Sequence, residues 1–116
     1  MPFNAPYAFM VSMDVEADKE ELFNEVYDEE HIPALLKVPG VIAVSRLKTE
    51  AGTLSLGGEE VPITGEGLPR YIAIYEIAIP GVLNSPAWAE AVEEGRWASQ
   101  VRPYTSNRSH VLRKLL

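Results

Sequence analysis

The most reactive pair of side chains in this sequence is a histidine and a tyrosine four residues apart, His31 and Tyr27. An imidazole has an ordinary pKa of about 6.5, so it can accept or donate a proton near neutral pH. On a continuous helix, residues four positions apart lie on the same side, so this pair could enolise a carbonyl compound or dehydrate a ring. The structural alternative is that His31 hydrogen-bonds a backbone group that Pro33 leaves free by interrupting the helix.

Three further residues are candidates for substrate binding. Glu30 is in line with an apolar helical stripe, where a carboxylate is either half-buried with a raised pKa or turned toward solvent. Tyr75 lies on a strand face that should meet the helices, so its hydroxyl could reach the neighbourhood of His31. Trp88 could supply an apolar wall, with Trp97 at the other end of the second helix. Each of the aromatic residues could equally be an ordinary core side chain.

No metal or cofactor site is predicted. The sequence contains no cysteine, and its two histidines are separated by most of the chain, so no metal-ligand spacing is present. The Gly57-Gly58 pair lacks the strand-to-helix context of a phosphate-binding loop. Haem ligation by either histidine stays an open alternative, although no motif supports it.

Composition narrows the class of protein. The 116 residues include 17 acidic and 10 basic side chains, which gives a formal net charge of −7. A surface this acidic repels phosphate backbones, so nucleic-acid binding is not expected. No apolar run approaches the roughly 18 residues of a membrane span, and no signal peptide is recognisable, so we expect no membrane association and a cytoplasmic protein.

The chain alternates between strand and helix patterns. Alternating apolar residues predict a strand over 7–15 with one wholly apolar face. A helix should follow, capped by Asp18 with Glu21 three residues on, and interrupted near His31 by Pro33. The other expected elements are strands over 41–48, 70–79 and 104–115, a long glycine-rich connection with a partial hairpin over 49–69, a helix capped by Ser85 and continuing to 94, and a link over 96–103.

The order βαββαβ predicts a single α+β domain over 1–116 with a ferredoxin-like fold: an antiparallel sheet with two helices on one face. The opposite face should present a half-apolar surface. Its expected members are Ser12, Asp14, Ile72, Ile74, Glu76, Arg108, His110 and Leu112. Such a surface favours pairing with a second copy, so we expect a homodimer in which two sheets form a dimeric α/β barrel.

The run from Tyr27 to Leu36, followed by Pro39-Gly40-Val41, resembles the signature of EthD-like proteins of the dimeric α/β-barrel superfamily. The run 70–76, with 85–88 behind it, is similar to the second half of the same unit. This resemblance implies that His31 lines a cavity between the helices and the sheet, with Tyr27 as the matching aromatic residue. The superfamily includes monooxygenases, isomerases, polyketide cyclases and dehydratases, and haem-binding enzymes, so the fold alone does not name a reaction.

From these observations we expect a cofactor-independent enzyme of the isomerase, cyclase/dehydratase or monooxygenase type, acting on a small apolar carbonyl or aromatic compound. His31 and Tyr27 would be catalytic, and Tyr75, Glu30 and Trp88 would contact the substrate. The alternative is a non-catalytic module, either ligand-binding or stress-associated. A third possibility is a structural dimer whose cavity is filled by side chains.

Overall fold

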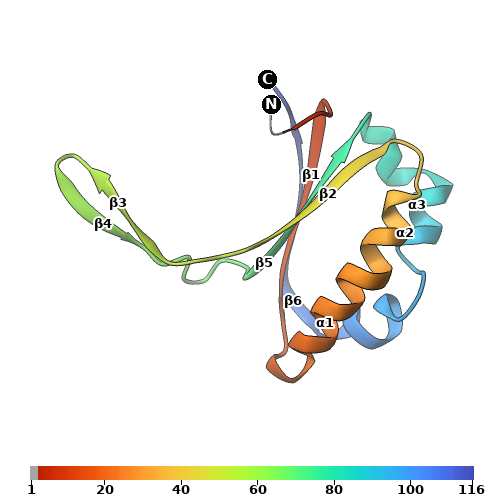
Figure 1. Cartoon of the computed structure of the whole chain (residues 1–116), viewed down its shortest axis with the longest axis horizontal. Helices are drawn as coiled ribbons and strands as arrows, with labels where there is room; N and C mark the ends of the chain where they lie inside the picture. The colour runs from red at the N-terminus through yellow and green to blue at the C-terminus, as the bar shows by residue number, and fades with distance from the viewer. Residues whose placement is uncertain (1–2) are drawn as a thin grey trace.

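The structure is a computed structural model, and it describes residues 3–116. A four-stranded antiparallel sheet is covered on one face by the helices, and a two-stranded hairpin projects away from it (Figure 1). The strands of the main sheet are β1 (Tyr7–Val15), β2 (Val41–Lys48), β5 (Tyr71–Ile77) and β6 (Thr105–Lys114). Their order, β2-β5-β1-β6, is the strand order expected for the ferredoxin-like fold, so the predicted fold class is confirmed.

The first helical region is broken, as Pro33 predicts. It consists of α1 (Glu20–Val26), a π-helical segment η2 (Tyr27–His31) and α2 (Ile32–Leu36). The N–H of Ile32 bonds the carbonyl of Tyr27, five residues back, because Pro33 has no N–H to continue the α-helical pattern.

The predicted capping box at Asp18 is wrong. Ala17–Lys19 form a short 3₁₀ turn, and the N–H of Glu20, which an Asp18 cap could have served, bonds the carbonyl of Ala17 instead. Helix α1 then begins at Glu20 without a side-chain cap. The backbone itself therefore satisfies a donor that a side-chain cap would have served.

The second helix begins as predicted but is shorter than predicted, and further helical turns follow it. Ser85 accepts a hydrogen bond from the N–H of Trp88 and caps α3 (Pro86–Ala91), which ends earlier than the expected residue 94. The segment expected to be a link is helical instead. It contains a second π-helical segment, η4 (Trp97–Val101), and a 3₁₀ turn, η5 (Arg102–Tyr104).

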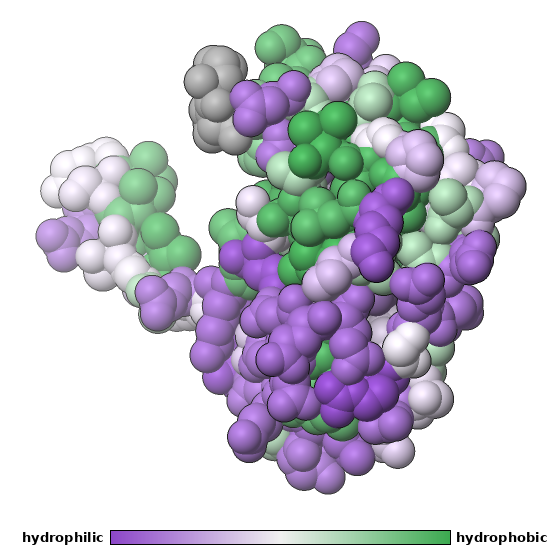
Figure 2. Space-filling model, turned by 45° about the vertical axis from the view of Figure 1, so that its right-hand side comes forward, coloured by the Kyte–Doolittle hydropathy of each residue, from purple (hydrophilic) through white to green (hydrophobic). Residues whose placement is uncertain are grey.

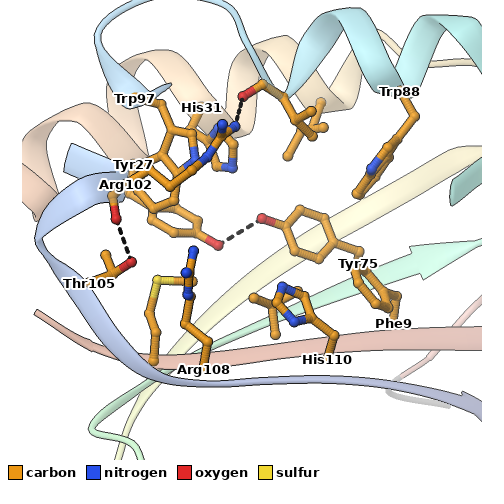
Figure 3. Close-up of a pocket in the computed structure, with 14 residues that line it drawn as sticks. Phe9, Tyr27, His31, Tyr75, Trp88, Trp97, Arg102, Thr105, Arg108 and His110 are labelled. Carbon is orange, nitrogen blue, oxygen red and sulfur yellow. Dashed lines mark hydrogen bonds between the residues drawn. The ribbon is translucent and has the colours of Figure 1, made fainter. Parts of the chain in front are cut away.

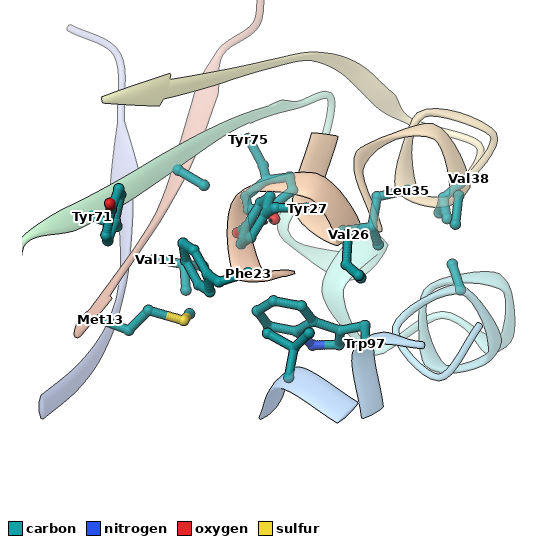
Figure 4. Packing of buried hydrophobic residues seen from close by; sticks show 14 of the residues in the cluster. Val11, Met13, Phe23, Val26, Tyr27, Leu35, Val38, Tyr71, Tyr75 and Trp97 are labelled. Atoms are coloured by element: carbon teal, nitrogen blue, oxygen red, sulfur yellow. Dashed lines mark hydrogen bonds between the residues drawn. The ribbon is translucent and has the colours of Figure 1, made fainter. Parts of the chain in front are cut away.

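The apolar face of β1 lies under the helices, as predicted. Val11 and Met13 are buried there, opposite Ala73 and Tyr71 of β5. Figure 4 shows these strand residues packed against the helices. The buried apolar cluster also includes Phe23, Val26, Tyr27, Ala34, Leu35, Val38, Tyr75, Ile77, Val82, Ala91, Trp97 and Val101.

The face predicted for Arg108, His110 and Leu112 of β6 is wrong. His110 is paired with Val11, and Leu112 with Phe9, so both lie on the face that meets the helices. The open face presents Ser109, Val111 and Arg113 of β6 instead, beside the expected Ser12, Ile72 and Ile74. Residues that pair across two antiparallel strands point to the same face of the sheet. Along this part of the β1–β6 pair, odd-numbered residues of β1 are paired with even-numbered residues of β6, as in Val11 with His110.

The glycine-rich connection forms the expected hairpin, from β3 (Gly52–Leu56) and β4 (Glu59–Ile63). All ten of its strand residues are exposed. The register places four apolar side chains on one face of the hairpin: Leu54, Leu56, Val61 and Ile63. Figure 2 shows apolar residues gathered along one side of this hairpin.

Candidate functional site

A pocket lies between the helices and the sheet and encloses about 620 Å³ of empty space, part of it open to solvent (Figure 3). Strands β1, β5 and β6 form its floor, and η2, α3 and η4 form its roof. His31, Tyr27, Tyr75 and Trp88 all line it, so the structure brings together four of the five residues selected from the sequence. The remaining lining residues are Phe9, Val11, Met13, Leu35, Val92, Trp97, Arg102, Thr105, Arg108 and His110.

His31 is buried against the roof of this pocket, with 5% of its surface exposed. Its ring stacks on the indole of Trp97 at a centroid distance of 4.2 Å and meets the ring of Tyr27 edge-on at 5.1 Å. Its Nδ1 is fully buried and has no hydrogen-bond partner among residues 3–116. The structural alternative, in which a ring nitrogen bonds a free backbone group, therefore does not describe this nitrogen.

The charge state of His31 follows from these surroundings. Burial, and to a smaller extent the nearby guanidinium of Arg102, lower the pKa of the imidazole to about 4. His31 is accordingly neutral at physiological pH, with one lone pair able to accept a proton.

Two π-helical segments position the stacked pair His31 and Trp97. His31 is the last residue of η2, and Trp97 is the first residue of η4. Each segment ends two residues before a proline, Pro33 or Pro103. The N–H of the residue just before each proline bonds the carbonyl five residues back: Ile32 to Tyr27, and Arg102 to Trp97. Single π-helical turns of this kind occur frequently at functional sites.

The hydroxyl groups of Tyr27 and Tyr75 meet inside the pocket at an oxygen–oxygen distance of 2.7 Å. Both side chains are buried. Burial raises the pKa of Tyr27 to about 12 and raises the pKa of Tyr75 well above its ordinary value. Both phenols are therefore protonated near neutral pH. One of the two O–H groups remains free to donate to a ligand, because their mutual bond uses only one proton.

Aromatic rings form the pocket walls around this polar centre. Trp88 meets Phe9 and Tyr75 edge-on, at centroid distances of 5.9 Å and 5.6 Å. The ring of His110 stacks on the ring of Phe9 at a centroid distance of 6.0 Å. Walls of this composition favour a flat, largely apolar ligand.

Glu30 does not line this pocket. Its carboxylate accepts hydrogen bonds from the backbone N–H of Arg96 at 2.9 Å and from the Arg96 Nε at 2.6 Å. These bonds lower the pKa of Glu30, so the expected alternative of a half-buried carboxylate with a raised pKa does not describe it. Since Arg96 immediately precedes Trp97, the interaction holds η4 against the first helical region.

Sequence reasoning missed three lining residues that bear nitrogen: Arg102, Arg108 and His110. The last two were assigned to the open face of the sheet, in a common group with Asp14 and Glu76. The structure separates that group. Asp14 accepts from the N–H of Arg70, and Glu76 accepts from the N–H of Asn4, both outside the pocket. The β1–β6 register was the missing information.

Within residues 3–116, no group of three or more metal-ligating side chains comes together. No helix in this part of the chain is long and apolar enough to cross a membrane.

The arrangement defines a class: a ferredoxin-like domain with a pocket between helices and sheet. No protein-family model matches the chain, and no curated protein matches it. Solved structures do match. A mutant of MhuD with two manganese protoporphyrin IX molecules per active site is 13% identical with a TM-score of 0.65, covering 96% of this chain and 95% of that one.

A second structure is the haem degrader MhuD from Mycobacterium tuberculosis with two haems, at 16% identity and a TM-score of 0.58 over 96% of both chains. A third is an EthD family protein from Bacillus halodurans, at 9% identity and a TM-score of 0.60, covering 95% of this chain and 99% of that one. The ferredoxin-like fold implied by the EthD-like resemblance is thereby confirmed. At these identities the likeness shows the fold alone.

Proposed function

We propose that the pocket binds a small, largely apolar carbonyl or aromatic compound and catalyses a proton transfer on it, with His31 as the base. The observation that supports this proposal is the buried, neutral imidazole without a hydrogen-bond partner at Nδ1, beside a pocket that contains two protonated phenols. A buried polar atom without a partner costs about 1–3 kcal/mol, so a fold selected for stability alone would not retain it.

The proposed step is enolisation. His31 removes a proton from the carbon next to the carbonyl; the C–H bond breaks, an N–H bond forms on the imidazole, and the electron pair leaves an enolate. Tyr27 or Tyr75 donates its free O–H to the enolate oxygen. The negative enolate raises the pKa of the adjacent imidazole and so favours its protonated form during the step. Return of the proton at another position gives an isomerisation. In a substrate with a β-hydroxyl, the enolate electron pair forms a C=C bond while the C–O bond breaks, and the proton held by His31 joins the leaving hydroxyl to give water, which is a dehydration.

The experiment that tests this proposal needs no knowledge of the natural substrate. A panel of aryl ketones is incubated with the protein in deuterium oxide, and exchange at the carbon next to the carbonyl is followed by NMR. We expect His31→Phe to lose about a hundredfold or more of the exchange rate. His110→Phe, the matched change at the chain's other histidine, should retain it. Exchange that is no faster with protein than with buffer, or that survives in His31→Phe, contradicts the proposal.

Ligand binding without exchange would support the alternative, a module that holds a ligand without chemistry. A second candidate function, haem binding, is favoured by the two imidazoles, His31 and His110, that line one aromatic pocket. His110 is exposed, and its ring lies beside Phe9. A haem titration followed in the visible spectrum tests this candidate: binding that is lost in His110→Phe or His31→Phe supports it, and an unchanged haem spectrum contradicts it.

We also propose that the open face of the sheet pairs with a second copy of the chain. Met10, Ile72, Ile74 and Val111 lie on this face, and the apolar face of the β3–β4 hairpin adds further exposed apolar surface. Apolar surface that is solvent-exposed in a monomer favours association.

Sedimentation tests the proposed homodimer. Wild-type protein at micromolar concentration should sediment as a dimer, and Ile74→Glu should shift it to the monomer. The matched control is Leu36→Glu, which introduces the same charge on the exposed side of α2. A monomeric wild type, or a dimer that tolerates Ile74→Glu, contradicts the proposal.

A further inference from the structure

The pocket has the opposite charge character to the rest of the chain. The chain contains 17 acidic and 10 basic side chains, yet the residues that line the pocket include Arg102 and Arg108 and no aspartate or glutamate. A surface with cations and no carboxylates inside an acidic protein favours an anionic group on the ligand.

The two arginines are in different states. Arg102 is already paired: its guanidinium contacts the carboxylate of Glu93 at 2.6 Å and donates to the carbonyl of Val92 at 2.7 Å. The guanidinium of Arg108 has no hydrogen bond or ion pair with any residue from 3 to 116. Figure 3 shows its side chain rising from β6 into the pocket, toward the region in which the Tyr27 and Tyr75 hydroxyls meet.

A β-bulge aims Arg108 into the pocket. Ser12 pairs with Ser109, but Asp14 pairs with Ser106, so Asn107 and Arg108 both lie opposite Met13. Asn107 has a φ of +51°, in the left-handed region that few residues other than glycine adopt. Its side-chain amide donates to the carboxylate of Asp14 at 3.1 Å, which holds this backbone conformation. Bulges next to active sites commonly redirect a side chain in this way.

We propose that Arg108 binds the carboxylate of the ligand, and that the ligand is a planar aromatic acid whose ring lies between the walls formed by Phe9, Tyr75 and Trp88. The planar fork of a guanidinium matches a carboxylate and can form two parallel hydrogen bonds with it. The carboxylate then lies at the side of the pocket formed by β6, and the remainder of the ligand extends toward the tyrosine pair and His31. This inference rests on the proposed function of the pocket as a ligand site.

Cinnamate and cinnamamide test the proposal, because they have the same shape and differ in charge. The chain has two tryptophans, Trp88 and Trp97, and both line the pocket, so tryptophan fluorescence reports directly on its occupancy. Wild-type protein at neutral pH should bind cinnamate about tenfold more tightly than cinnamamide, the effect of one charge-assisted interaction. Arg108→Gln should bind both compounds with the affinity that wild type has for cinnamamide.

Arg113→Gln is the matched control. Arg113 is on the same strand but faces the open side of the sheet, opposite Ala8, so this variant should keep the wild-type preference. Equal binding of the two compounds by wild type, or a preference that survives in Arg108→Gln, overturns the inference while the pocket remains a ligand site. Binding of neither compound by wild type overturns the inference together with the proposed function. Arg108 is exposed, so its replacement should leave the thermal midpoint close to that of wild type.

Discussion

The burial of His31 makes a quantitative prediction about stability and pH. The imidazole has an ordinary pKa of about 6.5 in the unfolded chain and a pKa of about 4 in the folded protein. Between these values the unfolded chain binds more protons than the folded one, so the free energy of unfolding rises with pH and is lost as the pH falls. Integration of this difference gives a loss of about 2 kcal/mol between about pH 7 and 5, and about 3 kcal/mol by about pH 4.

His31→Phe removes the titrating group and preserves a flat ring against Trp97. At neutral pH the variant should be more stable than wild type by about 1 kcal/mol, because it no longer contains the unpartnered Nδ1. At about pH 4 the advantage should reach about 4 kcal/mol, the sum of this term and the protonation term.

The assay is urea unfolding of both proteins at a series of pH values, followed by far-UV circular dichroism. Aspartate and glutamate carboxylates also titrate in this range, but they are present in both proteins, so their effect cancels in the difference between the two unfolding free energies. Parallel plots of unfolding free energy against pH for wild type and His31→Phe would refute the reasoning, because they would mean that His31 protonates as easily in the folded state as in the unfolded one.

Three further experiments test the pocket and the contacts around it. Tyr75→Phe should lower the free energy of unfolding in urea by about 1–3 kcal/mol, because it leaves the Tyr27 hydroxyl buried without its partner, and adding Tyr27→Phe should restore part of the loss. Glu30→Gln should lower the thermal midpoint at neutral pH but leave cinnamate affinity unchanged, since the carboxylate lies outside the pocket; a change in affinity would support a substrate-binding role for Glu30. Gly95→Ala should lower the free energy of unfolding in urea by about 1–2 kcal/mol because of its φ of +67° alone, and the added Cβ would also clash with the Glu30 carboxylate. The control Gly52→Ala has open space around it and should be nearly neutral, so equal effects of the two changes would contradict this account.

Local signals in the sequence were sufficient for most of the fold. Two strands were predicted with the observed bounds. The strand over 7–15 was predicted from its alternation of apolar and polar residues, and the strand over 41–48 from its β-branched residues. Ser85 followed by Pro86 predicted the start of α3, since both residues have a direct role at a helix N-terminus.

The same signals were insufficient where register decides the outcome. The polar strand β6 has no apolar period that would indicate which of its faces is buried. A bulge at Asn107 and Arg108 then shifts its alignment with β1 by one residue, and such a shift exchanges the two faces. Arg108 and His110 were therefore assigned to the open face, although they line the pocket.

The geometry of the site depends on Pro33 and Pro103, whose effects on the local helix cannot be predicted from the sequence alone. Pro33 predicted an interruption near His31, but an interruption can be a kink, a restart or a wider turn, and only packing selects among them. The wider turn observed at both Pro33 and Pro103 brings His31 and Trp97 into a stack. The second of these turns lies in the segment 96–103, which was expected to be a link.

The polar side chains in this core are difficult to explain by stability alone. Phenylalanine at positions 27 and 75 and at position 31 would fill similar space without two hydroxyls that must pair and a ring nitrogen that does not. Stability is instead supplied around the pocket: Arg46 lies over the outer face of Tyr27 at 4.6 Å, and Glu30 holds Arg96 beside Trp97. A rigid frame around a costly polar centre is what a site for proton transfer requires, because its groups must keep their positions and protonation states before the ligand arrives. If so, His31→Phe will be the more stable protein and the inactive one, and the two measurements on that single variant connect the energetics of the fold with its function.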